Sequence, residues 1–413
     1  MSRHKHNVNR AEVKRAKREA KKLLRSPRFF NELLDALERD GLVGEKENAL
    51  VVYTGVTSRV FPYPLNVFVK GQSSAGKNFL IKKVLRLLPR HAIADITSIS
   101  DKAWSYMGDR LRHKVVYIPE RNEDVGNVHP LRLLISEDKI KRRVTSWKHK
   151  KLSTKSYVAR GPVASLSTGK SQLTIDDATR HVSISINETA EQTRRIAKSY
   201  TRQTKRLSQD ELRTWRMVQR LLENRMGIEI DLPEWFDEVT DRLFVGDLRV
   251  RRYFPAFIEA CRTVCLIRSF QRRESSKENR LTMDFADFAM AALIFDHVFV
   301  ESLRLRKGVS ESTRDLITRL SARNGRPVGA KHVARELGVS MSRAHRMLRS
   351  AEAAGVIKRA NEPEKGNLKL YLAVPPPRFV PDPERLFRKL HLKKTVRIFH
   401  PITGERIVYR RKR

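Results

Sequence analysis

The feature of this sequence that most constrains its fold is a glycine-rich loop between a predicted strand and a predicted helix. Residues 65–71 (LNVFVKG) are a short apolar run, and residues 77–89 (KNFLIKKVLRLLP) have helical periodicity up to a proline. The loop fits the pattern G-x-x-x-x-G-K, with Asn78 where Ser or Thr is usual. The backbone amides of such a loop surround a phosphate at the positive end of a helix. The sequence therefore predicts a P-loop, and the alternative is a Gly/Ser turn with an exposed lysine. The nucleotide-binding residues would be Gly71, Ser73, Ser74, Ala75, Gly76, Lys77 and Asn78.

Further apolar runs predict the rest of a sheet. Strands are expected within residues 91–98, 114–120, 159–168 and 180–187. Because helices alternate with these strands, we expect an α/β fold with a mainly parallel sheet.

An acidic residue stands where one of these strands ends. Glu120 can orient an attacking water or hold a metal, and the alternative is an ordinary solvated carboxylate. Pro119 occupies the position of the first member of the usual acidic pair. Asn78 and Glu120 are therefore the candidate Mg²⁺ ligands, and Lys77 and Glu120 are candidate catalytic residues. The carboxylates that could substitute in part for Glu120 are Asp101, Glu123 and Asp124.

A hairpin is predicted between two strands of the sheet. Residues 141–147 and 152–160 alternate in polarity, and the link between them is cationic. Such a tip could follow the phosphates of a single strand without reading its sequence. A solvated basic turn is the alternative. The candidate nucleic-acid-binding residues of the tip are Lys148, His149, Lys150 and Lys151.

The C-terminal part has the rhythm of a winged helix-turn-helix. Residues 312–322 and 330–337 predict two helices, Gly338 ends the second, and residues 341–355 predict a third. Strands would flank a wing with its tip at residues 362–367. Met347 and Leu348 would face the core, and a protein-contact module is the alternative role. The candidate DNA-contacting residues are Ser342, Arg343, His345, Arg346 and Arg349 on the third helix, and Lys358, Lys365 and Lys369 on the wing.

Composition agrees with a nucleic-acid partner. The formal net charge is +39, and Lys and Arg bind phosphates with release of counterions. Cys261 and Cys265 share one helix face and have no further cysteine with which to complete a zinc site. No signal-peptide pattern and no apolar stretch of about 18 residues is present, so the sequence favours a cytoplasmic protein without a membrane partner.

Residues 26–195 resemble P-loop proteins of phages, plasmids and integrated elements that are described as DNA primase/helicase or replication proteins. The resemblance runs through VFVKGQSSAGKNFLIKKVLRLLP, YIPE, LRLLISEDKI, GPVASLSTGK and DDATRHVSISINETAEQT. These relatives belong with the AAA+ ATPases and are similar in layout to superfamily 3 helicases, which place a basic hairpin at a central pore.

The resemblance also implies roles for single residues. Thr168 would sense the γ-phosphate, and Arg180 would be an arginine finger that reaches a neighbouring subunit. A surface arginine is the alternative for Arg180. Arg132 and Glu137 would lie near the nucleotide. Gln192 and Arg195 follow the last strand, where a sensor arginine could lie. The sequence departs from the pattern at Asn78, Ser167, Ala178 and Asn187, which suggests a weakened ATPase.

The expected organisation has five parts. They are a basic arm (1–25), a P-loop AAA+-like domain (26–195), a helical domain (196–308), a winged helix-turn-helix (309–375) and a basic tail (376–413). The expected function is that of an ATP- and Mg²⁺-dependent helicase or replication initiator of a mobile element. It would form a homo-oligomeric ring, with single-stranded DNA at the hairpin and duplex DNA at the winged helix. The alternatives are a non-catalytic DNA-binding regulator with a degenerate P-loop and a packaging protein that acts through charge alone.

Overall fold

The computed structural model divides into two compact units, residues 1–296 with 380–413 and residues 297–379. It describes residues 2–96, 99–121, 128–148, 151–170, 173–201, 206–243, 245–272, 279–304, 327–353, 357–360, 369–373, 378–392 and 394–411. Among these residues, no helix is long and apolar enough to cross a membrane.

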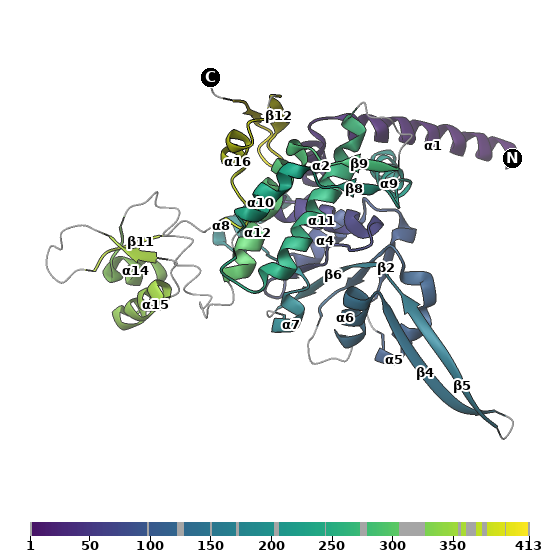
Figure 1. Ribbon diagram of the computed structural model, residues 1–413, viewed down its shortest axis with the longest axis horizontal. Coiled ribbons are helices and arrows are strands. Elements are labelled where there is room, and N and C mark those ends of the chain that lie inside the picture. Colours follow the sequence, from purple (N-terminus) through teal and green to yellow (C-terminus); the bar gives the residue numbers. More distant parts are fainter. Residues whose placement is uncertain are drawn as a thin grey trace. The chain divides into compact units, whose positions relative to one another are not determined.

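A five-stranded parallel sheet forms the centre of the first unit (Figure 1). Its strand order is β2-β3-β6-β1-β7, so β1 lies between β6 and β7. Each strand lies within a segment predicted from the apolar runs, except that β6 ends one residue beyond its segment, and β1 and β6 are almost wholly buried because they occupy the middle of the sheet. The strands are β1 (Val67–Lys70), β2 (Ile93–Asp95), β3 (Lys114–Ile118), β6 (Val163–Gly169) and β7 (Val182–Ser185).

Helices and short turns connect these strands. The predicted helix at residues 77–89 is present as α4, and α3 is buried over most of its length. The elements of this part are α2 (Phe29–Arg39), α3 (Lys46–Thr57), η1 (Ser58–Val60), α4 (Lys77–Leu85), η2 (Arg90–Ala92), α5 (Asp101–Trp104), η3 (Ser105–Leu111), α6 (Val128–Glu137) and α7 (Ile175–Ala178).

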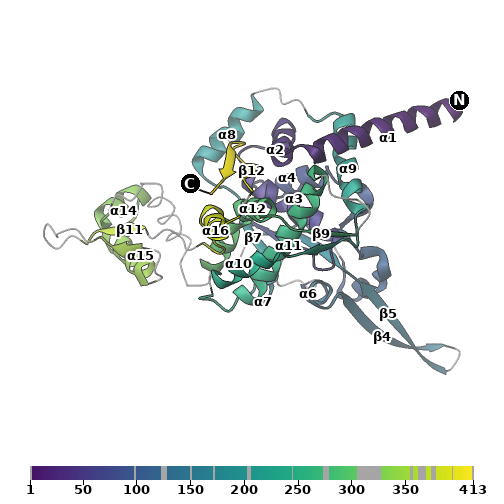
Figure 2. The same cartoon turned by 45° about the horizontal axis from the view of Figure 1, so that its top comes forward.

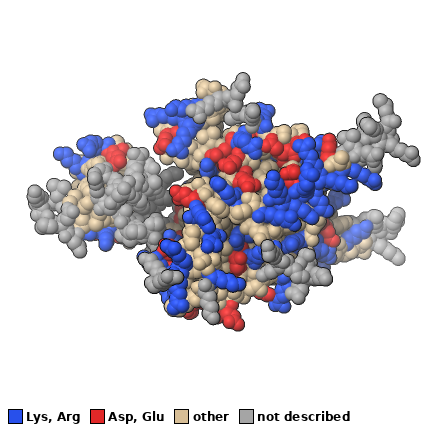
Figure 3. All heavy atoms as spheres, turned by 90° about the horizontal axis from the view of Figure 1, so that it is seen from above, with Lys and Arg blue, Asp and Glu red and all other residues tan. Residues whose placement is uncertain are grey.

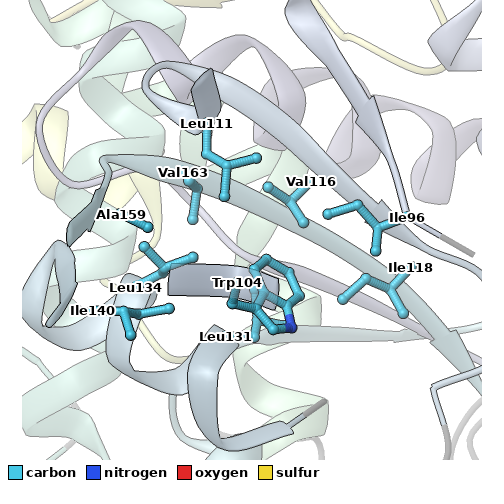
Figure 4. Packing of buried hydrophobic residues seen from close by; sticks show 10 residues of the cluster. All are labelled: Ile96, Trp104, Leu111, Val116, Ile118, Leu131, Leu134, Ile140, Ala159 and Val163. Carbon is cyan, nitrogen blue, oxygen red and sulfur yellow. The ribbon is translucent and has the colours of Figure 1, made fainter. Parts of the chain in front are cut away.

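The predicted hairpin is present and is anchored in the core. It consists of β4 (Lys139–Lys148) and β5 (Lys151–Arg160), which pair in antiparallel register from Lys139 opposite Arg160 to Lys148 opposite Lys151. At its base, Ile140 and Ala159 pack with Trp104 of α5 and with side chains of β3 and α6 (Figure 4). The hairpin projects from the rest of this unit in both ribbon views (Figures 1 and 2). A rigid core therefore supports a long protruding ribbon.

A helical region follows the sheet in the same unit, except that its last helix continues past residue 296 into the second unit. Its elements are α8 (Ala190–Tyr200), α9 (Gln209–Glu223), η4 (Glu234–Phe236), α10 (Asp237–Asp241), α11 (Val250–Arg268), η5 (Ser269–Gln271) and α12 (Phe285–Arg304). Two short strands that the sequence did not reveal, β8 (Glu229–Asp231) and β9 (Arg280–Thr282), pair in parallel. Cys261 and Cys265 are buried and free on α11, as their spacing indicated.

Both chain ends of this unit are folded against it. The basic N-terminal segment is a helix, α1 (Ser2–Arg25), whose Ala16, Ala20 and Leu24 are buried where it packs on α9. The C-terminal segment forms α16 (Pro383–Lys389) and a hairpin of β12 (Val396–Phe399) and β13 (Arg406–Tyr409). Asn31 of α2 donates a hydrogen bond to the His400 carbonyl at 3.0 Å, so this segment is a folded part of the first unit.

In the second unit, two helices and a strand pair lie where the sequence predicted parts of a helix-turn-helix. These are α14 (Ala330–Leu337), α15 (Met341–Ala353) and the antiparallel pair β10 (Ile357–Arg359) and β11 (Tyr371–Ala373). Gly338 ends α14 with φ +63°, a conformation that favours glycine. Met347 and Leu348 are buried in the core of this unit, as predicted. The predicted first helix (312–322) and the predicted wing tip (362–367) lie outside the described residues.

Candidate nucleotide-binding site

The glycine-rich loop lies at the carboxyl end of β1, in the middle of the sheet. The Gly71 N–H donates to the carbonyl of Gly169 at the end of β6, at 3.2 Å. Gly76 has φ +93° and directly precedes α4, and a Cβ built there would meet open space. The backbone is thus exposed to a ligand at a helix N-terminus where neighbouring parallel strands also end, which is where α/β sheets bind phosphates.

Lys77 is folded back onto this loop. Its side chain is 5% exposed, and its Nζ donates to the carbonyls of Gly71 and Gln72 at 2.6 Å each. Burial lowers the pKa of Lys77, opposed in part by the charges of Glu120 and Glu188. The amine is therefore held beside the loop by carbonyl groups, which a phosphate oxygen could replace as its partners.

A chain of hydrogen bonds joins Asn78 of α4, Tyr117 of β3, Glu120 just after β3 and Thr168 of β6. The Asn78 Oδ1 accepts from the Tyr117 hydroxyl at 3.1 Å and from the Thr168 hydroxyl at 3.3 Å. The Thr168 Oγ1 in turn accepts from the Glu120 N–H at 2.9 Å. Burial raises the pKa of Tyr117 to about 12, so this hydroxyl keeps its proton at neutral pH. The fold thus brings together Asn78, Glu120 and Thr168, which are far apart in the sequence.

The residues of this site fit a phosphate group better than they fit a metal ion. The exposed loop backbone, Gly76 and Lys77 fit a phosphate group. Asn78 fits a metal less directly, because both lone pairs of its Oδ1 already accept hydrogen bonds. Glu120 is exposed and has φ +54°, a strained backbone conformation that is typical of functional sites. Within the described part of the chain, no group of three His, Cys, Asp or Glu side chains is placed to hold a metal alone.

A buried ionic cluster of Asp177, Arg121 and Arg132 is linked to this network, and the sequence did not reveal it. Asp177 is 1% exposed, and its carboxylate accepts from Arg121 at 2.7 Å and from Arg132 at 3.0 and 3.1 Å. Burial alone would raise the pKa of Asp177, but hydrogen bonds from Arg132 and the charges of both arginines hold it below its usual value. The Arg121 N–H donates to the Thr168 carbonyl at 2.7 Å, which links this cluster to β6.

His181 completes the ionic cluster. It is 1% exposed, and its Nδ1 lies 2.8 Å from the carbonyl oxygen of Asp177 while Arg121 lies 3.4 Å from its Nε2. These contacts fit a neutral ring that donates from Nδ1 and accepts at Nε2. Burial, followed by the charge of Arg121, lowers the pKa of His181 to about 4, so the ring is neutral at pH 7.

Arg180 is hydrogen-bonded to residues of α6 and α7. Its side chain donates to Ser136 at 2.8 Å and to the Asp176 carbonyl. Its hydrogen bonds therefore go to α6 and α7 rather than to the phosphate-binding loop. Glu137 is exposed at the end of α6.

Three residues after the last strand have different roles. Gln192 is buried and donates to the Val43 carbonyl at 2.6 Å, and Arg195 forms an exposed ion pair with Glu191 one turn earlier on α8. The residue that sequence reasoning missed is Glu188, whose carboxylate accepts from the Gln72 N–H of the phosphate-binding loop. Its position between β7 and the Thr189 cap of α8 was the only signal available.

The candidate nucleic-acid residues divide between the two units. On α15, Ser342, Arg343, His345, Arg346 and Arg349 are all exposed, and so are Lys358 on β10 and Lys369 just before β11. Lys148 and Lys151 form the last backbone pair of the protruding hairpin. His149, Lys150 and Lys365 lie outside the described residues, as do Glu123 and Asp124.

A known family of P-loop domains matches the N-terminal part of the chain. A family model described as the MTBMA_p00010 P-loop domain matches residues 12–212. No curated protein matches the chain.

Solved structures with partial similarity come from several organisms. A full-length MCM homolog from Methanopyrus kandleri is 14% identical over 71% of this chain with a TM-score of 0.41, and the chain spans 62% of that protein's length. A RuvB variant from Thermotoga maritima is 13% identical over 85% of this chain and 96% of its own, with a TM-score of 0.26. The Aeropyrum pernix ORC1 protein in complex with DNA is 11% identical over 84% of this chain and 92% of its own, with a TM-score of 0.25. These scores are too low to carry an argument, but the family match and the loop geometry agree that residues 12–212 contain a P-loop domain.

Proposed function

We propose that this protein is an AAA+-like, nucleotide-dependent DNA-binding motor or replication initiator of a mobile genetic element. The observation that carries the proposal is the meeting of Lys77, Asn78, Glu120 and Thr168 at the carboxyl edge of one parallel sheet. Three separate segments supply these residues, and Lys77, Glu120 and Thr168 are of types that phosphoryl transfer to water requires.

Each residue has a distinct task in this proposal. ATP with Mg²⁺ supplies the phosphoanhydride bond that is cleaved. Lys77 exchanges its carbonyl partners for phosphate oxygens and offsets their charge. Glu120 orients the attacking water, and Thr168 fixes the Glu120 backbone through its hydroxyl. Arg180, whose bonds lie away from the loop of its own chain, would act on a neighbouring copy in a ring.

DNA engagement is assigned to two regions. The hairpin of β4 and β5 would present its basic tip to a single strand, since a protruding ribbon can follow a backbone without reading bases. Helix α15 would enter the major groove of a duplex with its exposed Arg343 and Arg346.

ATP hydrolysis with and without single-stranded DNA tests the enzymatic part. We expect turnover that rises with DNA and is lost in Lys77→Ala, because that change removes the charge beside the loop. Lys82→Ala is a matched control, since Lys82 lies exposed on the same helix. Turnover that survives in Lys77→Ala would contradict the assignment of the site.

A duplex-binding titration tests the C-terminal module. The double variant Arg343→Gln, Arg346→Gln should weaken binding by about 1–3 kcal/mol for each lost base contact. Arg335→Gln on the neighbouring helix α14 is an exposed control. Equal binding by the variant and the control would assign this module to another partner.

A non-catalytic DNA-binding regulator is the second candidate. The observation in its favour is that the Asn78 Oδ1 is already engaged by Tyr117 and Thr168, so the usual hydroxyl ligand of the metal is replaced by an occupied amide. Asn78→Ser should raise turnover if the protein is a motor and leave the rate at background if it is a regulator.

A further inference from the structure

A group of four arginines outside the P-loop site is gathered where α4 and η2 meet α9. We define this arginine cluster as Arg86, Arg90, Arg216 and Arg220. The Arg216 Nε donates to the Arg86 carbonyl at 3.2 Å, which joins the two helices at this point. Arg216 and Arg220 are one turn apart on α9 and share a face of the helix.

Nearby carboxylates do not neutralise this cluster. Asp40 is shared between Arg86 at 2.5 Å and Lys83 at 3.0 Å. Glu223 is paired with the fully buried Arg59 and with His91. Among the described residues, Arg90, Arg216 and Arg220 have no carboxylate within 4.0 Å, so the cluster has an excess of positive charge.

The electrostatics show that the arginines affect one another. Burial, and then the charges of Arg90, Arg86 and Arg220, lower the pKa of Arg216. Like charges within reach of one another are unfavourable in the free protein, and a bound anion would relieve the repulsion.

The shape of the surface is open to a long anion. A cleft of about 240 Å³ lies between α9 and α1, and it is lined by Arg213, Arg216, Met217 and Arg220 of α9 and by Glu12, Val13 and Ala16 of α1. Glu12 pairs with Arg213 at 3.0 Å, so the charge of Arg213 is balanced while those of Arg216 and Arg220 are not, among the residues that the structure describes. Helix α1 adds exposed lysines at positions 14, 17 and 21. Figure 3 shows Lys and Arg gathered on the side of the molecule where α1 lies.

We propose that the arginine cluster binds the phosphodiester backbone of DNA, without reading its sequence, as a contact separate from the P-loop, the hairpin and α15. A backbone fits better than a single phosphate, because the cations continue from η2 across α9 onto α1 rather than closing around one point. This contact adds to the proposed function and does not depend on nucleotide hydrolysis.

The test is a salt titration of the full-length protein with a fluorescent duplex of arbitrary sequence. The variant Arg90→Gln, Arg220→Gln removes two exposed cations that have no ion pair in the described structure. We expect roughly tenfold weaker binding or more at moderate salt, and a slope of log K against log salt that falls by about 2, since each phosphate contact contributes about 0.9. The matched control is Arg397→Gln, Arg406→Gln on the C-terminal hairpin, which removes the same charge from exposed positions.

Each other outcome overturns the proposal. Equal losses in variant and control would mean that net charge alone matters. An unchanged slope in a variant that still depends on Arg343 and Arg346 for duplex binding would refute this contact but leave the proposed function intact. No duplex binding by wild type would refute both. A changed oligomeric state without DNA would assign the face to a second copy, and lost binding to anionic vesicles with unchanged duplex binding would assign it to a lipid surface.

Discussion

The phosphate-binding region and helix α15 both carry several charged residues, but they hold them in opposite ways. Near the loop, a cluster of charged groups is buried and paired, as with Asp177, which is 1% exposed and bound by Arg121 and Arg132. On α15, Arg343 and Arg346 are exposed, and only apolar residues face the core. The fold therefore sets the geometry of the first region before a ligand arrives, whereas the second region presents charge that a partner must order.

Removal of the Asp177 charge should have the largest effect. Asp177→Asn leaves two arginines near each other without their carboxylate, and breaking a buried pair of this kind destabilises a protein by about 3–5 kcal/mol. All four tryptophans lie in the first unit, so their fluorescence during urea unfolding reports on that unit alone. Asp176→Asn is the control, because Asp176 is the exposed neighbour. Equal midpoints for the two variants would show that the buried cluster does not hold the site.

Acid should weaken the same region through His181. The pKa of its ring is about 4 in the folded protein and about 6.5 when unfolded, so the unfolded chain takes up a proton first as the pH falls. The stability is therefore complete above about pH 6.5 and is lost progressively toward pH 4, by about 3 kcal/mol in total. We expect this pH dependence in tryptophan-detected unfolding of wild type and a flatter profile in His181→Gln. Identical profiles would show that other groups cause the loss.

The difference between the two regions also explains what could be predicted. Periodicity predicted the five strands, α14 and the inward-facing Met347 and Leu348, because these depend on local apolar spacing. The pattern G-x-x-x-x-G-K predicted that Lys77 lies at the loop, because this pattern is also local in the sequence. The contacts of Arg121, Asp177 and His181 could not be predicted, because each joins segments that only the sheet brings together. Glu188 was missed because its contact depends on the course of the chain after β7.

Loss of the Thr168 hydroxyl should lower the turnover more than loss of the neighbouring Ser167 hydroxyl. Thr168→Val keeps the shape but leaves the Glu120 N–H without its acceptor, which destabilises by about 1–3 kcal/mol. We expect lower turnover with nucleotide binding retained, measured by steady-state hydrolysis and by fluorescent-nucleotide titration. Ser167→Ala is the control, since the Ser167 hydroxyl is buried without a hydrogen-bond partner among the described residues. A Ser167→Ala enzyme impaired as strongly as Thr168→Val would contradict this role.

The smallest expected effect concerns the contact of Glu188 with the phosphate-binding loop. Its carboxylate accepts from the Gln72 N–H, and a Cβ built on Gly71 would lie 3.0 Å from its Oε1, so it occupies the approach to the loop. A phosphate must displace this carboxylate, and like charges oppose its arrival. Glu188→Ala should therefore tighten ADP binding by about 1 kcal/mol, or roughly fivefold, in a fluorescent-nucleotide titration. Glu191→Ala, which removes an exposed carboxylate three residues later, should leave the affinity unchanged. Weaker ADP binding in Glu188→Ala would instead mean that the carboxylate supports the loop, and the charges on this side of the site would then be as fixed by the fold as those around Asp177.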